Sequence, residues 1–148
     1  MTVRASIVAG IAVAVCAVLP TGQAAATPPE GDAVRTDIAK GTTETPVSIN
    51  TDGPTTLIVQ SLVLPPGAAS GWHTHPGTEL SVITGGSVEL QTATACDPVT
   101  YAAGQAVSIP AGVPHRVANE SGSQAQVVLT YTIGVDAPVR GDAPDPCA

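Results

Sequence analysis

The chain carries at residues 67–86 the sequence GAASGWHTHPGTELSVITGG. This stretch contains two of the three histidines, His73 and His75, and a carboxylate, Glu79, four residues after the second histidine. Side chains two residues apart point to the same face of an extended strand, so both imidazoles should project together. Imidazole nitrogens and a carboxylate oxygen that converge on one face are suitable ligands for a divalent transition metal.

The third histidine, His115, lies in a second stretch marked by glycine and proline, GQAVSIPAGVPHRVAN, at residues 104–119. If the two stretches meet in space, His73, His75, Glu79 and His115 form one site for a single metal ion. Three nitrogen ligands and one oxygen ligand suit Mn, Fe(II), Ni, Cu(II) or Zn without choosing between them. An octahedral ion would keep up to two positions open for water, substrate or dioxygen.

Both stretches resemble the two cupin motifs. In that family, the first motif places HxH, a glutamate and a glycine after an initial glycine, and the second places PxG, a histidine and an asparagine after another glycine. The chain has a matching residue at every signature position: Gly67, His73, His75, Glu79, Gly86, Gly104, Pro110, Gly112, His115 and Asn119. The resemblance implies a single-domain, type 2-like cupin: all-β, with a double-stranded β-helix or jelly-roll barrel around one divalent metal ion. The WHTHPG sequence, a cysteine between the motifs and a proline-rich C-terminal segment also resemble small secreted cupin-domain proteins of actinobacteria.

The residue pattern of the whole chain independently favours an all-β fold. Glycine (15 residues) and proline (14 residues) are abundant, and no long segment after residue 26 has helical periodicity. Strands are expected in segments rich in β-branched or alternating residues: 47–50, 55–64, 71–75, 78–84, 87–92, 105–109, 115–118 and 125–135. Residues 93–103 are expected to form a loop or a short strand.

Residues 1–26 are typical of a secretory signal peptide, because Arg4 precedes an apolar run that ends in small residues suited to cleavage. The run, residues 5–19, is too short for a stable membrane span. Cys16 does not follow a small residue, which argues against lipidation, and it should leave with the leader. We therefore expect a secreted protein. Its parts would be a flexible N-terminal tail at 27–46, a β-barrel at 47–135 and a C-terminal tail at 136–148.

Two cysteines, Cys96 and Cys147, remain once the leader is removed. In an exported protein, two cysteines indicate one disulfide, which here would join the loop between the motifs to the C-terminal tail. The alternative is that Cys96 is a thiolate ligand of the metal, which would require its side chain to reach the barrel interior.

The net charge of −7 at pH 7 and the lack of a basic run argue against nucleic-acid binding, because nothing would neutralise the phosphates. Anionic membrane surfaces are disfavoured for the same reason. The edge strands of such a barrel would allow pairing into a homodimer. Strands at 55–64 and 125–133, which could line a pocket, hold mostly aliphatic or small residues. They predict a compact, weakly polar small-molecule ligand or substrate.

Three functions fit these features, and no catalytic residue is identified beyond the metal ligands. The first, by analogy with cupins that share the ligand set, is a metal-dependent, dioxygenase-like oxidoreductase acting on a small organic substrate. The alternatives are a non-catalytic metal- or small-ligand-binding protein, and an isomerase or decarboxylase that uses the metal as a Lewis acid. Glu79 is expected to be a fixed ligand. In some cupin relatives the matching glutamate is instead thought to leave the metal and take a proton.

Overall fold

The computed structural model describes residues 31–148, and the expected signal peptide, residues 1–26, lies outside them. The chain divides into two units, Met1–Arg35 and Thr36–Ala148, and residues 31–35 of the first contain no helix or strand. The second unit has only strands as regular elements: β1 (Thr55–Leu64), β2 (His73–Thr74), β3 (Thr78–Gly85), β4 (Ser87–Thr92), β5 (Ala95–Ala102), β6 (Ala106–Ile109), β7 (His115–Ala118), β8 (Ala125–Gly134) and β9 (Gly141–Asp142). No described segment is a helix of the length and hydropathy that would cross a membrane.

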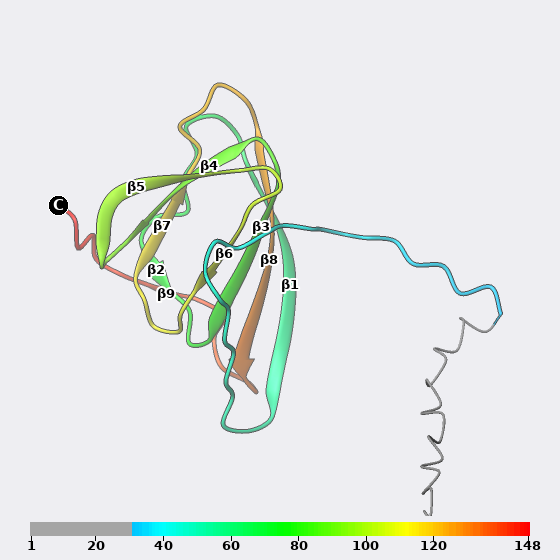
Figure 1. The fold of residues 1–148 in the computed structure, drawn as a ribbon. Coiled ribbons are helices and arrows are strands. Elements are labelled where there is room, and N and C mark those ends of the chain that lie inside the picture. Colours follow the sequence, from blue (N-terminus) through cyan, green and yellow to red (C-terminus); the bar gives the residue numbers. More distant parts are fainter. Residues whose placement is uncertain (1–30) are drawn as a thin grey trace, which may run out of the picture. The chain divides into compact units, whose positions relative to one another are not determined.

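The strands form two sheets that face each other (Figure 1). One sheet has the order β1-β8-β3-β6 and the other has the order β5-β4-β7-β2-β9. All pairings between these strands are antiparallel. Because the chain crosses repeatedly between the sheets, segments distant in sequence become neighbours in space. The predicted all-β, jelly-roll fold is confirmed.

Strand β8 illustrates how the interior forms. Its residues alternate between buried and more exposed positions, with Val127, Leu129, Tyr131 and Ile133 facing inward. The strand lies between β1 and β3, at the centre of its sheet, so this inward face packs against residues of neighbouring strands. Full burial of each aliphatic side chain contributes roughly 1.5–3 kcal/mol relative to exposure. The core is therefore built mainly from aliphatic side chains, as expected for a chain without phenylalanine.

Strand β3 carries the change from apolar core to polar site. Glu79, Ser81 and Ile83 alternate along it and are all buried, with 1%, 5% and 1% of their surface exposed. The inward face of β3 is therefore polar at Glu79 and Ser81 and apolar at Ile83. A carboxylate so deeply buried requires a compensating partner.

The turn between β3 and β4 depends on a glycine of the first motif. Gly86 has a φ of 64°, and a Cβ at this position would lie 2.6 Å from the carbonyl oxygen of Gln124. Any other residue would meet both a strained backbone conformation and a steric clash. The glycine therefore sets the close approach of this turn to the start of β8.

Two segments differ from the predicted strands. Residues 47–50 form no strand, because they are exposed and have no neighbouring strand with which to pair. Residues 95–102 instead form a full strand, β5, paired with β4. Upstream, Thr42 alone makes a bridge to Gln105, at the edge of the sheet beside β6.

The segment after β8 is bound to the barrel rather than extending as a free tail. Strand β9 pairs with β2, placing Asp142 opposite His73 and Gly141 opposite Thr74. This pairing covers the backbone of a strand that would otherwise be the edge of its sheet. This strand could not be predicted from the residue pattern, because two residues are too few to show alternation. We call residues 136–147 the C-terminal strap.

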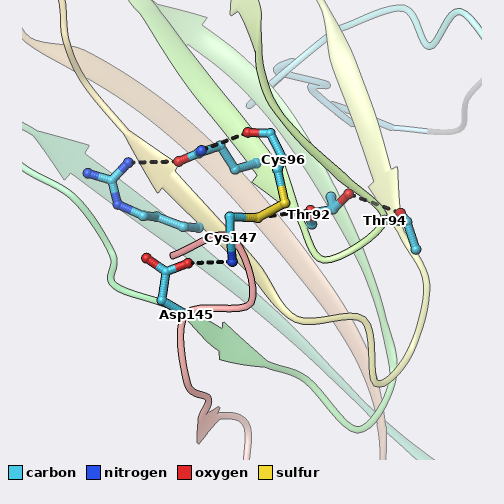
Figure 2. The surroundings of a disulfide bond; sticks show 7 residues. Thr92, Thr94, Cys96, Asp145 and Cys147 are labelled. Carbon is cyan, nitrogen blue, oxygen red and sulfur yellow. Dashed lines mark hydrogen bonds between the residues drawn. A yellow bond between two sulfur atoms is a disulfide. The ribbon is translucent and has the colours of Figure 1, made fainter.

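A disulfide between Cys96 and Cys147 holds the end of this strap against β5 (Figure 2). The two Cα atoms are 5.5 Å apart. The backbone N–H of Cys147 also donates to Asp145 at 2.8 Å. The predicted disulfide is therefore present, and the alternative of Cys96 as a metal ligand is excluded because its sulfur is bonded to Cys147.

Candidate metal centre

Four buried side chains from both sheets meet at one end of the barrel interior. His73 on β2 lies directly opposite His115 on β7, and His75 follows β2. Glu79 reaches the same point from β3 in the other sheet. Their potential ligand atoms all lie within 4.8 Å of one another, and no residue of the four is more than 5% exposed. The structure thus brings together all four residues that the sequence singled out.

Backbone carbonyls fix the orientation of all three imidazole rings. The Nδ1 atoms of His73 and His115 lie 2.9 Å from the carbonyl oxygens of Gly71 and Val113, each two residues earlier in the chain. A carbonyl can only accept, so Nδ1 must carry the proton. The tautomer leaves Nε2 with a free lone pair, as in histidines that bind a metal.

The third ring, His75, is oriented from a distant part of the chain. Its Nδ1 lies 2.5 Å from the carbonyl oxygen of Val139, in the C-terminal strap. The partner is 64 residues away in sequence, so short-range motif spacing could not reveal it. The strap therefore contributes to the centre without supplying a ligand.

The Nε2 atoms of His75 and His115 both lie close to one carboxylate oxygen of Glu79, an arrangement that a bound cation would stabilise. Glu79 Oε2 lies 3.0 Å from Nε2 of His75 and 3.3 Å from Nε2 of His115. All three atoms are buried without a hydrogen-bond partner. When the rings are neutral and protonated on Nδ1, both Nε2 atoms and Glu79 Oε2 are hydrogen-bond acceptors. Buried acceptors that face one another without a donor are unfavourable. A divalent cation between them would satisfy every lone pair, so the residues fit a metal ion.

The second oxygen of Glu79 is held separately. The Ser81 hydroxyl donates to Oε1 at 2.5 Å. In the absence of a metal ion, burial by itself raises the pKa of Glu79, but hydrogen bonds that additional protons on His115 and His75 would donate, together with the Ser81 hydroxyl, outweigh it and lower this pKa to about 2. Oε2 thus attracts either protons on the imidazoles or a metal ion.

Burial also keeps His73 available as a neutral ligand. It lowers the pKa of His73 from 6.5 to about 4, although the hydrogen bond to the Gly71 carbonyl acts in the opposite direction. The imidazole is therefore unprotonated at neutral pH, as metal ligation requires.

A cavity of about 650 Å³ opens onto the four residues. Its apolar wall includes Leu62 and Leu129, which agrees with the aliphatic lining predicted for these strands. Its polar wall includes Tyr131 and Arg140, so the expectation of a weakly polar pocket holds for only part of the surface. The difference arises because Arg140 comes from the C-terminal strap, which the sequence did not place near the site.

Tyr131 is a second side chain at the site that sequence reasoning did not single out. Its ring centroid lies 4.3 Å from that of His75. Burial, followed by the negative charge of Glu79, raises the pKa of the phenol above its ordinary value, so the hydroxyl stays protonated at neutral pH. Its position on the inward face of β8 was visible in the alternation of that strand, which is the signal that could have found it.

The chain matches the family model described as a cupin domain over residues 60–131. No curated protein matches it. The DMSP lyase DddQ from Ruegeria pomeroyi is a similar solved structure, with a TM-score of 0.51 and 21% identity, covering 58% of this chain and 42% of the lyase. This chain therefore spans less than half of the lyase.

A second similar structure comes from Klebsiella pneumoniae and is described as a conserved protein with a double-stranded β-helix domain. It has a TM-score of 0.53 and 16% identity, covering 65% of this chain and 90% of its own. At these identities the likeness shows the fold alone. The domain match covers just under half of the chain, and the two antiparallel sheets and the fold of these neighbours agree with a cupin-type double-stranded β-helix.

Proposed function

We propose that this protein binds one divalent transition-metal ion through His73, His75, Glu79 and His115, and acts on a small organic molecule held in the adjoining cavity. The observation that carries the proposal is the set of buried acceptor atoms, two ring nitrogens and one carboxylate oxygen, that face one another without a proton donor. The mixed nitrogen and oxygen ligands suit Mn, Fe, Ni, Cu or Zn.

The chain's own residues prepare the site for this role. Three carbonyls hold the imidazoles in one tautomer, and Ser81 holds the carboxylate by one oxygen. Apolar side chains, among them Leu62 and Leu129, line part of the cavity beside the ligands. When bound, a metal ion of this class supplies Lewis-acid or redox chemistry.

The first candidate reaction is oxidation of the small molecule by dioxygen. Four protein ligands leave room for further ligands on a six-coordinate ion, and the cavity reaches the ligands directly. Glu79 acts here as a fixed ligand, because the Ser81 hydroxyl and its own burial restrain it.

A second candidate, elimination or decarboxylation without dioxygen, is favoured by Tyr131. Its hydroxyl lies in the cavity wall close to the ligands and remains protonated at neutral pH. A phenol in that position can donate a proton to a substrate or hold its oxygen by a hydrogen bond. Glu79 and His75 contact each other at the metal centre, whereas Tyr131 lies beside them without being one of the four ligands.

The test begins with metal content. Protein purified from its export route, and metal-free protein dialysed against each candidate ion, should contain about one equivalent by elemental analysis. His115→Ala should lose it, whereas Arg116→Ala, whose side chain contacts Gln91 and Glu120 instead, should keep it. A wild type that takes up none of these ions would refute the proposal.

Oxygen uptake then separates the two reactions. Turnover of a panel of phenols and organic acids that consumes oxygen and is lost in His73→Ala would support oxidation. Turnover that is unchanged without oxygen and depends on Tyr131 would support the second reaction. Tight binding without any turnover would identify a non-catalytic binding protein.

We also propose that the protein works outside the cytoplasm. The disulfide between Cys96 and Cys147 supports this, because such bonds persist in oxidising compartments. Labelling of free thiols in cell fractions provides the test. Export predicts that unlabelled, oxidised protein is recovered outside the cytoplasm.

A further inference from the structure

The C-terminal strap places a single guanidinium at the cavity that contains the metal ligands. Val139 and Arg140 both line this cavity. The backbone is fixed on either side of Arg140, since the Val139 carbonyl accepts from His75 and β9 pairs with β2 immediately afterwards. The N–H of Ala143 also donates to the Trp72 carbonyl at 3.1 Å. Arg140 therefore projects from an anchored segment and not from a free tail.

A carboxylate on the outer side orients the Arg140 side chain. Its Nε and Nη2 donate to Asp142 Oδ1 at 3.2 and 3.1 Å. Asp142 is exposed, with 90% of its side chain accessible, whereas the Arg140 side chain is 40% accessible. An arginine has five N–H donors, so this pairing leaves others free for a molecule in the cavity.

The guanidinium also lies close to Gly71 of the first motif. A Cβ at that position would lie 3.8 Å from Nη2 of Arg140, and Gly71 has a φ of 71°, which favours glycine. Burial is the main cause of both pKa shifts, lowering the pKa of His73 and raising that of Tyr131; the positive charge of Arg140 adds to the first shift and opposes the second. The guanidinium is thus near enough to both faces of the site to interact with a ligand held between them.

Arg140 is the side chain of this cavity that could bind an anion. Among the residues that line it, Arg140 is the only one besides the histidines with a basic side chain, and Glu79 is the only acidic one. The protein as a whole has a net charge of −7, which would repel anions from most of its surface. A cationic group inside the cavity is therefore a specific feature of this place.

We propose that Arg140 binds the carboxylate of a small organic acid whose other end lies against the residues of the metal centre. This rests on the proposed function, because it names the substrate class of the same site. Planar guanidinium and carboxylate groups form paired, charge-assisted hydrogen bonds, which fix orientation as well as affinity. Asp142 acts as a positioning residue that keeps the guanidinium directed across the mouth of the cavity.

The test compares charged and neutral probes on the metal-loaded protein. Calorimetric titration with acetate, succinate and benzoate, and with acetamide, succinamide and benzamide, measures the contribution of the carboxylate. At least one acid should bind wild type more tightly than its amide. That preference should fall about tenfold or more in Arg140→Gln, as expected for loss of a hydrogen bond between charged groups.

Two control variants and a metal assay complete the design. Arg140→Lys keeps the charge but loses the planar pairing, so it should bind the acid with intermediate affinity. Arg116→Gln removes a positive charge outside the cavity and should bind the acid as wild type does. Metal content is measured in every variant and should not change.

The outcomes separate the two proposals. If wild type takes up no metal, the proposed function fails. If metal content is normal but no acid binds more tightly than its amide, or Arg140→Gln retains the preference, the role of Arg140 is refuted and the metal proposal stands. Binding of the acids by metal-free protein, lost in Arg140→Gln, would support the guanidinium as the anion site independently of the metal.

Discussion

Replacing both cysteines of the disulfide, Cys96→Ser with Cys147→Ser, should lower the free energy of unfolding by an amount set by the length of the loop that the disulfide closes. The disulfide joins residues 51 apart in sequence. In the chain-entropy model, a loop of this length removes about 14 cal/mol/K from the unfolded state, which is about 4 kcal/mol at 25 °C. Both residues are at least partly exposed, so the substitution adds little loss of packing.

Urea unfolding followed by the fluorescence of Trp72, the only tryptophan, measures this change. With an m value of about 2 kcal/mol/M, the midpoint should fall by about 2 M. Reducing agent should lower the wild type to the same midpoint and leave the double variant unchanged. A double variant whose midpoint stays within about 0.3 M of the oxidised wild type would refute the loop-closure reasoning.

The same variant should bind metal more weakly, because the disulfide secures the strap that orients His75. Removing the orienting partner of a metal-ligating histidine costs about 10- to 100-fold in affinity. Here the Val139 carbonyl stays in place but is less firmly held, so we expect a loss below tenfold. Competition with a chromogenic chelator provides the measurement.

Three further results are expected. Ser81→Ala removes the hydrogen bond to Glu79 Oε1 and should weaken metal binding about tenfold in the same chelator assay, and unchanged affinity would show that the hydroxyl does not orient the carboxylate. Gly77→Ala places a Cβ 1.6 Å from the Thr132 carbonyl oxygen and should destabilise the protein by about 3 kcal/mol or more in urea, whereas Gly122→Ala, with open space around it, should have little effect. The metal-free protein should lose stability as pH falls from 6.5 to 4, because burial lowers the pKa of His73 to about 4 and the unfolded state binds more protons in this range. Below pH 4.5 the pKa of Glu79, lowered to about 2, should cause a further loss of stability for the same reason. Urea curves at pH 7, 5.5 and 4 check the sign, and a flat profile would contradict it.

The four candidate ligands were predictable because each lies in a short motif with its own signals. Alternation brings His73 and His75 to one face, and glycine or proline turns bound the strands that carry Glu79 and His115. The long strands β1 and β8 were also visible: β8 shows a period of two, whereas β1 was recognised from its run of β-branched and apolar residues. Local patterns therefore accounted for the barrel and for the residues that face its interior.

The contribution of the strap was not predictable in the same way. Val139 acts through its backbone carbonyl, to which the identity of the side chain is irrelevant, and Arg140 stands alone in a stretch rich in proline and charge. Strand β9 is too short for any periodicity. These contacts depend on the three-dimensional path of the chain after β8, which no spacing between motifs encodes.

The dependence of His75 on Val139 has a consequence for the order in which the centre can assemble. A polypeptide synthesised as far as the end of β8 already contains all four candidate metal ligands. The His75 ring, however, still lacks the Val139 carbonyl that holds its Nδ1 proton. That group follows five residues later, and the covalent closure of the strap waits for residue 147. Orientation of this ring is thus completed only once the strap is in place, and oxidation of the thiol pair then secures it, so a chain shortened after β8 would retain every ligand but lack the carbonyl that orients His75.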